Sequence, residues 1–154
     1  MGPFFPYSYI GPDSTKTGIL AQMASGNERP AESRLRVLVV DDHMRIADTT
    51  AEVLEQAGFE VRAAYTGGSA LQIAANFHPD CLLSDIVMPG MNGVELGMVF
   101  RASHPATRVV LISGQAGISE ILEDAERRGL EFELLAKPIH PSKLIEYLRS
   151  TPKR

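Results

Sequence analysis

From Leu35 onward the chain alternates between two kinds of segment without a break, and this alternation is its most constraining feature. Short runs rich in apolar residues predict strands, and the segments between them repeat apolar residues at helical spacing. The predicted strands are 35–40, 59–64, 81–84, 108–112 and 131–136. The helical patterns lie at 46–57, 70–74, 94–100, 118–125 and 144–148. Strict alternation with short connections is typical of a parallel sheet covered by helices on both faces.

The character of each strand also predicts its place in the sheet. Segments 37–40, 81–83 and 109–112 are almost entirely apolar, as central strands buried on both faces should be. Segments 59–64 and 131–136 alternate polar with apolar residues, which suits sheet edges. The flavodoxin-like strand order 2-1-3-4-5 satisfies both conditions and places a ligand site between the first and third strands. We therefore expect an α/β protein with a doubly wound (βα)5 fold.

Residues 1–33 differ from the rest of the chain. They contain several prolines and glycines, an aromatic patch at 4–10, and no sustained period of either kind. We interpret them as a flexible N-terminal arm, and residues 34–154 as one folded domain.

The composition narrows the class of protein. Hydrophobic residues make up 44% and charged residues 22% of the chain, as in ordinary soluble proteins. A net charge of −4 gives no electrostatic footprint for direct nucleic-acid binding. No stretch approaches the roughly 20 apolar residues of a membrane span, and the start does not read as a secretory signal. The single Cys81 excludes an internal disulfide framework, so we expect a cytoplasmic protein without membrane contact.

Four of the predicted strands end in polar residues that suit one chemistry. These residues are Asp41-Asp42, Asp85, Ser113 and Lys137. The carboxyl ends of parallel strands meet at one edge, where three carboxylates would repel one another unless a cation neutralises them. A divalent metal among oxygen ligands is the simplest remedy, and a lysine and a hydroxyl then suit a phosphoryl group on that metal.

Each of these residues also has an ordinary structural role. Asp41 and Asp42 could cap the following helix, and Asp85 could cap the tight turn that the Pro89-Gly90 dipeptide predicts. A serine often ends a strand, and Lys137 alone would be a solvated loop residue. The prediction therefore rests on the whole set.

The same residues carry a family resemblance. Asp41-Asp42, the loop 85–93 (DIVMPGMNG), Ser113-Gly114 and Lys137-Pro138 occur in order, and residues 35–150 resemble the receiver domain of two-component response regulators. The resemblance implies that Asp85 accepts a phosphoryl group from a histidine kinase or histidine phosphotransfer protein in a reaction that needs Mg²⁺.

The resemblance also assigns roles to the neighbours of Asp85. It implies that Asp42 binds Mg²⁺ directly, that Asp41 binds mainly through water, and that Asp85 and the backbone carbonyl of Val87 are further ligands. Ser113 and Lys137 would bind the phosphoryl oxygens. Movement of Ser113 would reorganise the face made by helix 118–125, strand 131–136 and helix 144–148. That face would contact a downstream protein target or a second copy of the chain.

One position departs from the family pattern. Receivers usually carry Tyr or Phe three residues before the lysine, as a switch that reports phosphorylation, and this chain has Leu134 there. Phe132, on the same face of the predicted strand, is the alternative aromatic. The phosphoryl chemistry is therefore better supported than the usual aromatic switch.

These features predict a stand-alone response regulator, a phosphoacceptor and not a turnover enzyme. The alternative is a degenerate receiver, or a receiver fragment of a hybrid kinase, that binds partners without phosphorylation. A haloacid-dehalogenase-type phosphatase is disfavoured, because that family needs a second Asp two positions after its nucleophile, and residue 43 is His. The acidic residues of segment 118–126 form either a solvated face or a docking face for a basic partner.

Overall fold

The computed structural model describes residues 34–114 and 119–150. The strands are β1 (Arg36–Val40), β2 (Glu60–Ala64), β3 (Cys81–Asp85), β4 (Arg108–Ser113) and β5 (Glu133–Ala136). The helices are α2 (Met44–Gln56), α3 (Gly67–Phe77), α4 (Gly93–Ser103), α5 (Ser119–Arg127) and α6 (Pro141–Arg149). Strand and helix alternate throughout, as the sequence predicts. The largest correction to a strand is at β5, which begins two residues later than predicted because Phe132 packs against α4 and leaves the ladder to start at Glu133.

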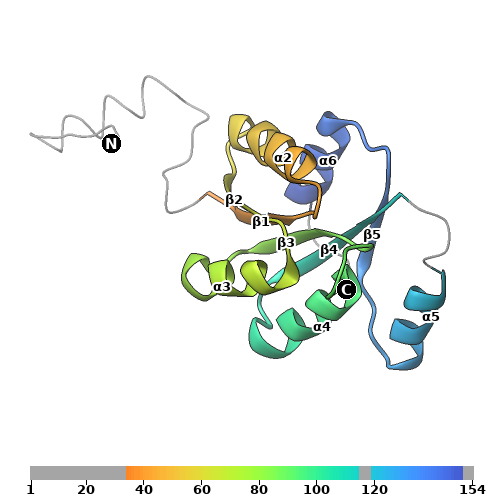
Figure 1. Cartoon of the computed structure of the whole chain (residues 1–154). Helices are drawn as coiled ribbons and strands as arrows, with labels where there is room; N and C mark the ends of the chain where they lie inside the picture. Colours follow the sequence, from red (N-terminus) through yellow and green to blue (C-terminus); the bar gives the residue numbers. More distant parts are fainter. Residues whose placement is uncertain (1–33, 115–118, 151–154) are drawn as a thin grey trace, which may run out of the picture. The chain divides into compact units, whose positions relative to one another are not determined.

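All five strands pair in parallel in the order β2-β1-β3-β4-β5 (Figure 1). Val40 at the end of β1 lies opposite Ser84 of β3, and Asp85 lies opposite Ile112 of β4. The chain reverses direction between β1 and β3, so the carboxyl ends of these two strands form the crevice of a doubly wound sheet. The predicted flavodoxin-like fold is confirmed.

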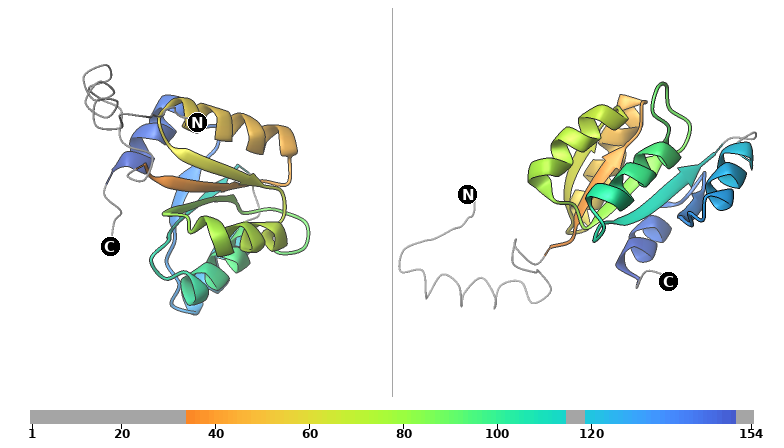
Figure 2. Two further views of the ribbon diagram at one scale, coloured as in Figure 1. Left: turned by 90° about the vertical axis from the view of Figure 1, so that its left-hand side faces the viewer. Right: turned by 90° about the horizontal axis from the view of Figure 1, so that it is seen from below.

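Helices cover both faces of the sheet, and each face has its own hydrophobic cluster. Helices α2 and α6 lie on one face, and α3, α4 and α5 lie on the other (Figures 1 and 2). Alternate residues of β1 serve the two faces, so Leu38 and Val40 pack toward α3 while Val37 and Val39 pack toward α2. The central strands are therefore apolar on both sides.

The edge strands differ as expected. Strand β5 alternates half-buried with exposed residues, and β2 has one exposed and two half-buried residues, whereas β3 is buried along its whole length. Polar side chains at the edges keep the unpaired backbone from recruiting another strand.

An ion-pair cluster ties β5 to β4 and to α6. The guanidinium of Arg108 meets the carboxylate of Glu133 in two contacts, Nη2 to Oε1 at 2.7 Å and Nε to Oε2 at 2.8 Å. The hydroxyl of Tyr147 donates to the same carboxylate at 2.7 Å, and the guanidinium lies 5.1 Å from the centre of the Tyr147 ring. Bidentate pairing of this kind fixes geometry as well as charge. No local pattern in the sequence predicts this cluster.

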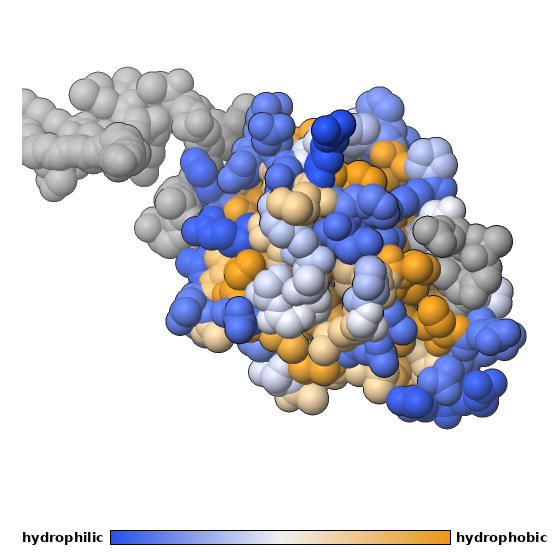
Figure 3. Space-filling view, viewed as in Figure 1, coloured by the Kyte–Doolittle hydropathy of each residue, from blue (hydrophilic) through white to orange (hydrophobic). Residues whose placement is uncertain are grey.

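Strongly hydrophilic residues gather over α5 in the space-filling view (Figure 3). The acidic face predicted there is partly neutralised, because Asp124 pairs with Arg127 at 3.6 Å and with Arg128 at 3.1 Å. None of the helices among residues 34–114 and 119–150 has the length and apolar character to cross a membrane. The predicted arm at residues 1–33 lies outside the described residues.

Candidate functional site

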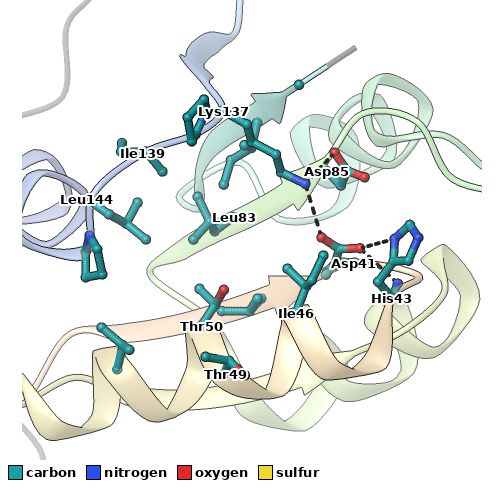
Figure 4. A pocket seen from close by; sticks show the side chains of 17 residues that line it. Asp41, His43, Ile46, Thr49, Thr50, Leu83, Asp85, Lys137, Ile139 and Leu144 are labelled. Atoms are coloured by element: carbon teal, nitrogen blue, oxygen red, sulfur yellow. Dashed lines mark hydrogen bonds and ion pairs between the residues drawn. The ribbon is translucent and has the colours of Figure 1, made fainter.

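Asp41 and Asp85 lie side by side at the carboxyl edge of the sheet. Asp41 directly follows β1 and Asp85 ends β3, and both are buried, with 5% and 8% of their surface exposed. The amino group of Lys137 reaches between them from the end of β5, with its Nζ 3.5 Å from Oδ2 of Asp41 and 3.5 Å from Oδ1 of Asp85 (Figure 4). The lysine therefore neutralises part of the repulsion that the sequence predicts.

Burial dominates the electrostatics of Asp85. Loss of solvent raises the pKa of its carboxyl above the ordinary value, the charge of Lys137 lowers it, and the charge of Asp41 raises it again. The net pKa remains raised, which means that Lys137 does not fully compensate for the buried charge. An additional cation would stabilise the ionised form.

Two glycines make room for this arrangement. A Cβ atom on Gly114 would lie 2.9 Å from Cβ of Lys137, so the residue after Ser113 must be small for the lysine to pass. A Cβ atom on Gly93 would clash with the backbone carbonyl oxygen of Asp85, and the Gly93 amide donates to the carbonyl of Ile86 at 2.8 Å. The loop after β3 therefore folds tightly over the strand end.

Helix α4 begins directly after that loop with a full capping box. The side chain of Asn92 accepts from the amide of Glu95 at 2.8 Å, and the side chain of Glu95 accepts from the amide of Asn92 at 2.9 Å. Two otherwise free amides are satisfied, which fixes where the helix starts. The turn residues of segment 89–93 thus hold Asp85 on an ordered strand end, as the sequence predicts.

Asp42 and His43 continue the acidic edge outside Asp41. Oδ1 of Asp42 is buried and has no hydrogen-bond partner among residues 34–114 and 119–150. The ring nitrogen Nδ1 of His43 lies 3.3 Å from Oδ1 of Asp41 (Figure 4) and 3.5 Å from Oδ1 of Asp42. Ligand atoms of the three residues all fall within 4.8 Å of one another.

This arrangement fits a divalent cation. A buried carboxylate oxygen without a partner is costly, and hard cations such as Mg²⁺ take oxygen ligands of this kind. Asp41 is already engaged, because one oxygen accepts the backbone amide of His43 at 2.9 Å and the other faces Lys137. Asp42 is therefore the carboxylate with a free oxygen for a metal.

A cavity of about 600 Å³ runs from these residues between α2 and the segment that leads into α6 (Figure 4). Asp41, Asp85 and Lys137 stand at one end, and the walls are largely apolar, including Ile46 and Leu144. Sequence reasoning missed this cavity, since the lining residues have the ordinary spacing of helix faces that pack on a sheet.

The other predicted residues lie around this edge with less direct contact. Ser113 ends β4, and its backbone carbonyl accepts the amide of Lys137 at 2.8 Å. The side chain of Val87 is 39% exposed in the loop after β3. Leu134 of β5 is 44% exposed. The Phe132 ring lies 4.7 Å from the guanidinium of Arg101, just before β5 begins and so at the end of the strand away from the acidic edge.

The fold and the acidic edge agree with the comparison of the sequence with protein families. Residues 37–149 match the response regulator receiver domain, and the chain belongs to this family. Among solved structures, the receiver domain protein of Methanospirillum hungatei matches with a TM-score of 0.67 and 31% identity, over 76% of this chain and 92% of that one. The chemotaxis protein CheY4 of Vibrio cholerae matches with a TM-score of 0.67 and 28% identity, over 76% of this chain and 98% of that one.

Curated relatives are longer proteins. The DNA-binding response regulator MtrA of Mycobacterium tuberculosis is 32% identical over 124 residues, which are 79% of this chain and 52% of that protein. A response regulator receiver protein of an Anaeromyxobacter species is 35% identical over 111 residues, which are 72% of this chain and 46% of that protein. The chain thus spans about half the length of the curated relatives it matches.

Proposed function

We propose that this protein is a phosphorylation-dependent response regulator, in which Asp85 accepts a phosphoryl group from a histidine kinase or a histidine phosphotransfer protein. One observation carries the proposal. Asp85 stands at the end of a central strand beside Asp41, and Lys137 bridges the two at 3.5 Å from each. A nucleophilic carboxylate, a cation and a metal-binding carboxylate are then held together before any substrate arrives.

The transfer itself is a simple displacement. An oxygen of the Asp85 carboxylate forms a bond to phosphorus while the bond from phosphorus to the donor's imidazole nitrogen breaks, and the electron pair of that bond stays with the imidazole. The product is an acyl phosphate on Asp85. Phosphoryl transfer of this kind depends mainly on positioning and on neutralising the oxygens of the phosphoryl group.

The remaining residues would serve those two purposes. Asp42 would ligate Mg²⁺ through its free oxygen, with Asp41, Asp85 and the carbonyl of Val87 as further ligands. Bound Mg²⁺ would supply positive charge for the phosphoryl oxygens. Lys137 would move from its carboxylate partners to the phosphoryl group, and Ser113 would donate its hydroxyl to the same group. The protein would be a phosphoacceptor that assists its own reaction and not a turnover enzyme.

The output would be a surface contact, in keeping with a stand-alone receiver in the cytoplasm. The face formed by α5, β5 and α6 would change on phosphorylation and bind a downstream protein target or a second copy of the chain. The MtrA relatives are DNA-binding regulators, whereas this chain has a net charge of −4 and no electrostatic footprint for nucleic acid. We therefore propose a protein partner and no direct contact with nucleic acid.

Incubation with Mg²⁺ and acetyl phosphate or phosphoramidate, followed by intact mass measurement, tests the proposal. We expect one phosphoryl adduct on the wild type and none on Asp85→Asn. Asp124→Asn, the same change at a surface carboxylate of α5, should keep the adduct. Omission of Mg²⁺ should abolish it. A wild-type protein without an adduct at saturating donor would contradict the proposal.

The exposure of Leu134 favours one second candidate. A position where receivers usually carry a switching aromatic is here an aliphatic side chain that is 44% exposed. A degenerate receiver, or a receiver fragment of a hybrid kinase, could use such a surface for binding without phosphorylation. Partner capture that is equal for wild type and Asp85→Asn would support this reading, and capture that depends on the adduct would support the switch.

A further inference from the structure

His43 is a residue whose side chain has no role in the helix that it begins. It is the N-cap of α2, the position where a side chain usually accepts a backbone amide of the first turn, but its ring makes no capping hydrogen bond. The ring turns instead toward the carboxylate of Asp41 (Figure 4), and its Nδ1 is also near that of Asp42. With 65% of its side chain exposed, it is not held there by burial.

The position of the ring is set by the backbone. The amide of His43 donates to Oδ1 of Asp41 at 2.9 Å, so the residue is anchored two positions after the carboxylate whose oxygen it faces. A simple contact between the ring and Asp41 would satisfy an oxygen that already has a partner. It would leave the buried Oδ1 of Asp42 unsatisfied, at 3.5 Å from Nδ1. One ion shared by Asp42 and His43 would satisfy both.

The spacing suits such an ion. Ligand atoms at right angles on an octahedral ion with bonds of about 2.1 Å lie roughly 3 Å apart. Nδ1 of His43 is 3.3 Å from the Asp41 oxygen and 3.5 Å from the Asp42 oxygen, so a small movement of an exposed side chain brings it into a coordination sphere. A neutral imidazole is a good ligand for Ni²⁺, Fe²⁺ and Zn²⁺, whereas Mg²⁺ prefers oxygen.

We propose that His43 is a direct nitrogen ligand of the cation site, and that it shifts the preference of the site from Mg²⁺ toward divalent first-row transition ions. The inference rests on the proposed function, since it assumes that Asp42 is a metal ligand there. It adds a chemical selectivity that the carboxylates alone do not supply. In a cell that contains both kinds of ion, the identity of the bound cation would then depend on residue 43.

Equilibrium titrations of untagged protein with Mg²⁺ and with Ni²⁺ test whether His43 is a ligand and whether it shifts the ion preference of the site. Loss of an outer partner of a ligand commonly weakens a metal site about 10–100-fold, so loss of a ligand itself in His43→Asn should weaken Ni²⁺ by roughly tenfold or more. Mg²⁺ affinity should stay within about twofold, because Asn offers an oxygen in place of the nitrogen. His78→Asn, the same change at an exposed histidine after α3, should alter neither affinity.

Pulsed electron paramagnetic resonance on Mn²⁺-loaded wild type gives a direct signature. Modulation from a coordinated ¹⁴N nucleus should be present in the wild type and in His78→Asn, and absent in His43→Asn. Unchanged Ni²⁺ affinity in His43→Asn, together with no ¹⁴N modulation in the wild type, would overturn the inference about His43. Loss of Mg²⁺ binding in Asp42→Asn would in that case still support the proposed function. Failure of the wild type to bind either ion would overturn both.

Discussion

The amino group of Lys137 lies 3.5 Å from Oδ1 of Asp85, although Asp85 ends β3 and Lys137 follows β5, which is not a neighbour of β3 in the sheet. The lysine reaches the site by passing the backbone of Gly114, where a Cβ atom would crowd its side chain. Its charge occupies the place where a bound cation or a phosphoryl group would need to be accommodated. In the proposed function Lys137 would therefore repel a bound cation and attract a phosphoryl group.

Replacement of Lys137 by Met should separate these two effects. Removal of a positive charge near Asp41 and Asp85 should tighten Mg²⁺ binding by roughly tenfold, as expected for charges several ångströms apart in a partly solvated site. The rate of phosphorylation by acetyl phosphate should fall, because the charge that receives the phosphoryl oxygens is gone. Calorimetric titration and timed intact mass measure the two quantities. Lys143→Met, on the exposed side of α6, is the control, and equal changes in both variants would contradict the assignment.

Replacement of Asp85 by Asn should stabilise the fold at neutral pH in the absence of divalent ions. Burial raises the pKa of Asp85 in the folded state, so the ionised carboxylate opposes folding at pH 7. The free energy of unfolding should rise by on the order of 1 kcal/mol in the variant. The difference should shrink as the pH falls through the folded pKa and vanish below the ordinary pKa of about 3.9, where both states are protonated.

Urea unfolding in EDTA across this pH range measures the difference. Asp124→Asn removes an exposed ion pair on α5 and should change stability by less than about 0.5 kcal/mol. A less stable Asp85→Asn at pH 7 would show that Lys137 fully compensates for the buried charge.

Replacement of Glu133 by Gln should have the opposite pH dependence. Burial raises the pKa of Glu133, but hydrogen bonds from Arg108 and Tyr147 outweigh it and hold the net pKa below the usual range. The ionised form therefore supports folding, and the variant should lose about 2 kcal/mol at pH 7. The loss should begin to fade as the pH falls below the ordinary pKa of about 4.3, and should be gone only below the lowered folded pKa, where the wild-type carboxyl is neutral in both states.

Thermal or urea unfolding at several pH values measures this loss. The matched control is Glu146→Gln, since Glu146 meets Lys143 only at 3.9 Å on an exposed surface of α6. That change should cost less than about 0.5 kcal/mol. A loss in Glu133→Gln that persists unchanged at low pH would mean that packing and not charge holds the cluster.

Replacement of Gly93 by Ala should damage both stability and the site. The new methyl group would collide with the carbonyl oxygen of Asp85, so the loop must move, at a cost of about 1–3 kcal/mol. Gly68→Ala is the control, because space is open around that glycine in α3 and the change should stabilise by about 0.4–1 kcal/mol. Unfolding free energies and acetyl phosphate reactivity should fall together only for Gly93→Ala.

Replacement of Val87 by Asn should shorten the lifetime of the acyl phosphate. Val87 is two residues after Asp85 and 39% exposed, and its aliphatic side chain cannot orient an attacking water, whereas an amide can. Loss of the adduct after removal of the donor should be several times faster in the variant. Gln115, two residues after Ser113, is a second side chain able to orient a water, and it lies outside the described residues. Equal decay of the two phosphoproteins would rule the role of position 87 out.

Sequence reasoning reached the fold and the edge where the candidate site lies because both follow from local pattern. Period and strand character fixed the order of the sheet, and a residue that follows a parallel strand must lie at its carboxyl edge, which located Asp41 and Asp85. It did not reach the bridge made by Lys137 or the turn of the His43 ring toward Asp42. Those contacts depend on side-chain rotamers and on which loop passes over the site. Neither produces a periodic pattern in the sequence.

The same limit explains the Arg108–Glu133–Tyr147 cluster. Its members come from β4, β5 and α6, and the register of β4 against β5 decides whether the guanidinium can reach the carboxylate. As isolated residues they predict only a polar edge strand and a helix with one aromatic residue. Their partnership became visible only with the paired strands in place.

The pairing of β1 with β3 also has a consequence for the folding of the protein. Asp41 and Asp85 belong to segments that are far apart along the chain and meet only when β1 slots between β2 and β3. If Asp85 and Asp42 hold the cation together, as proposed, a fragment that lacks either strand would bind it more weakly, and the unfolded chain would lack the complete site. Ion binding would therefore report on folding, because only a chain in which β1 and β3 have paired would retain the ion.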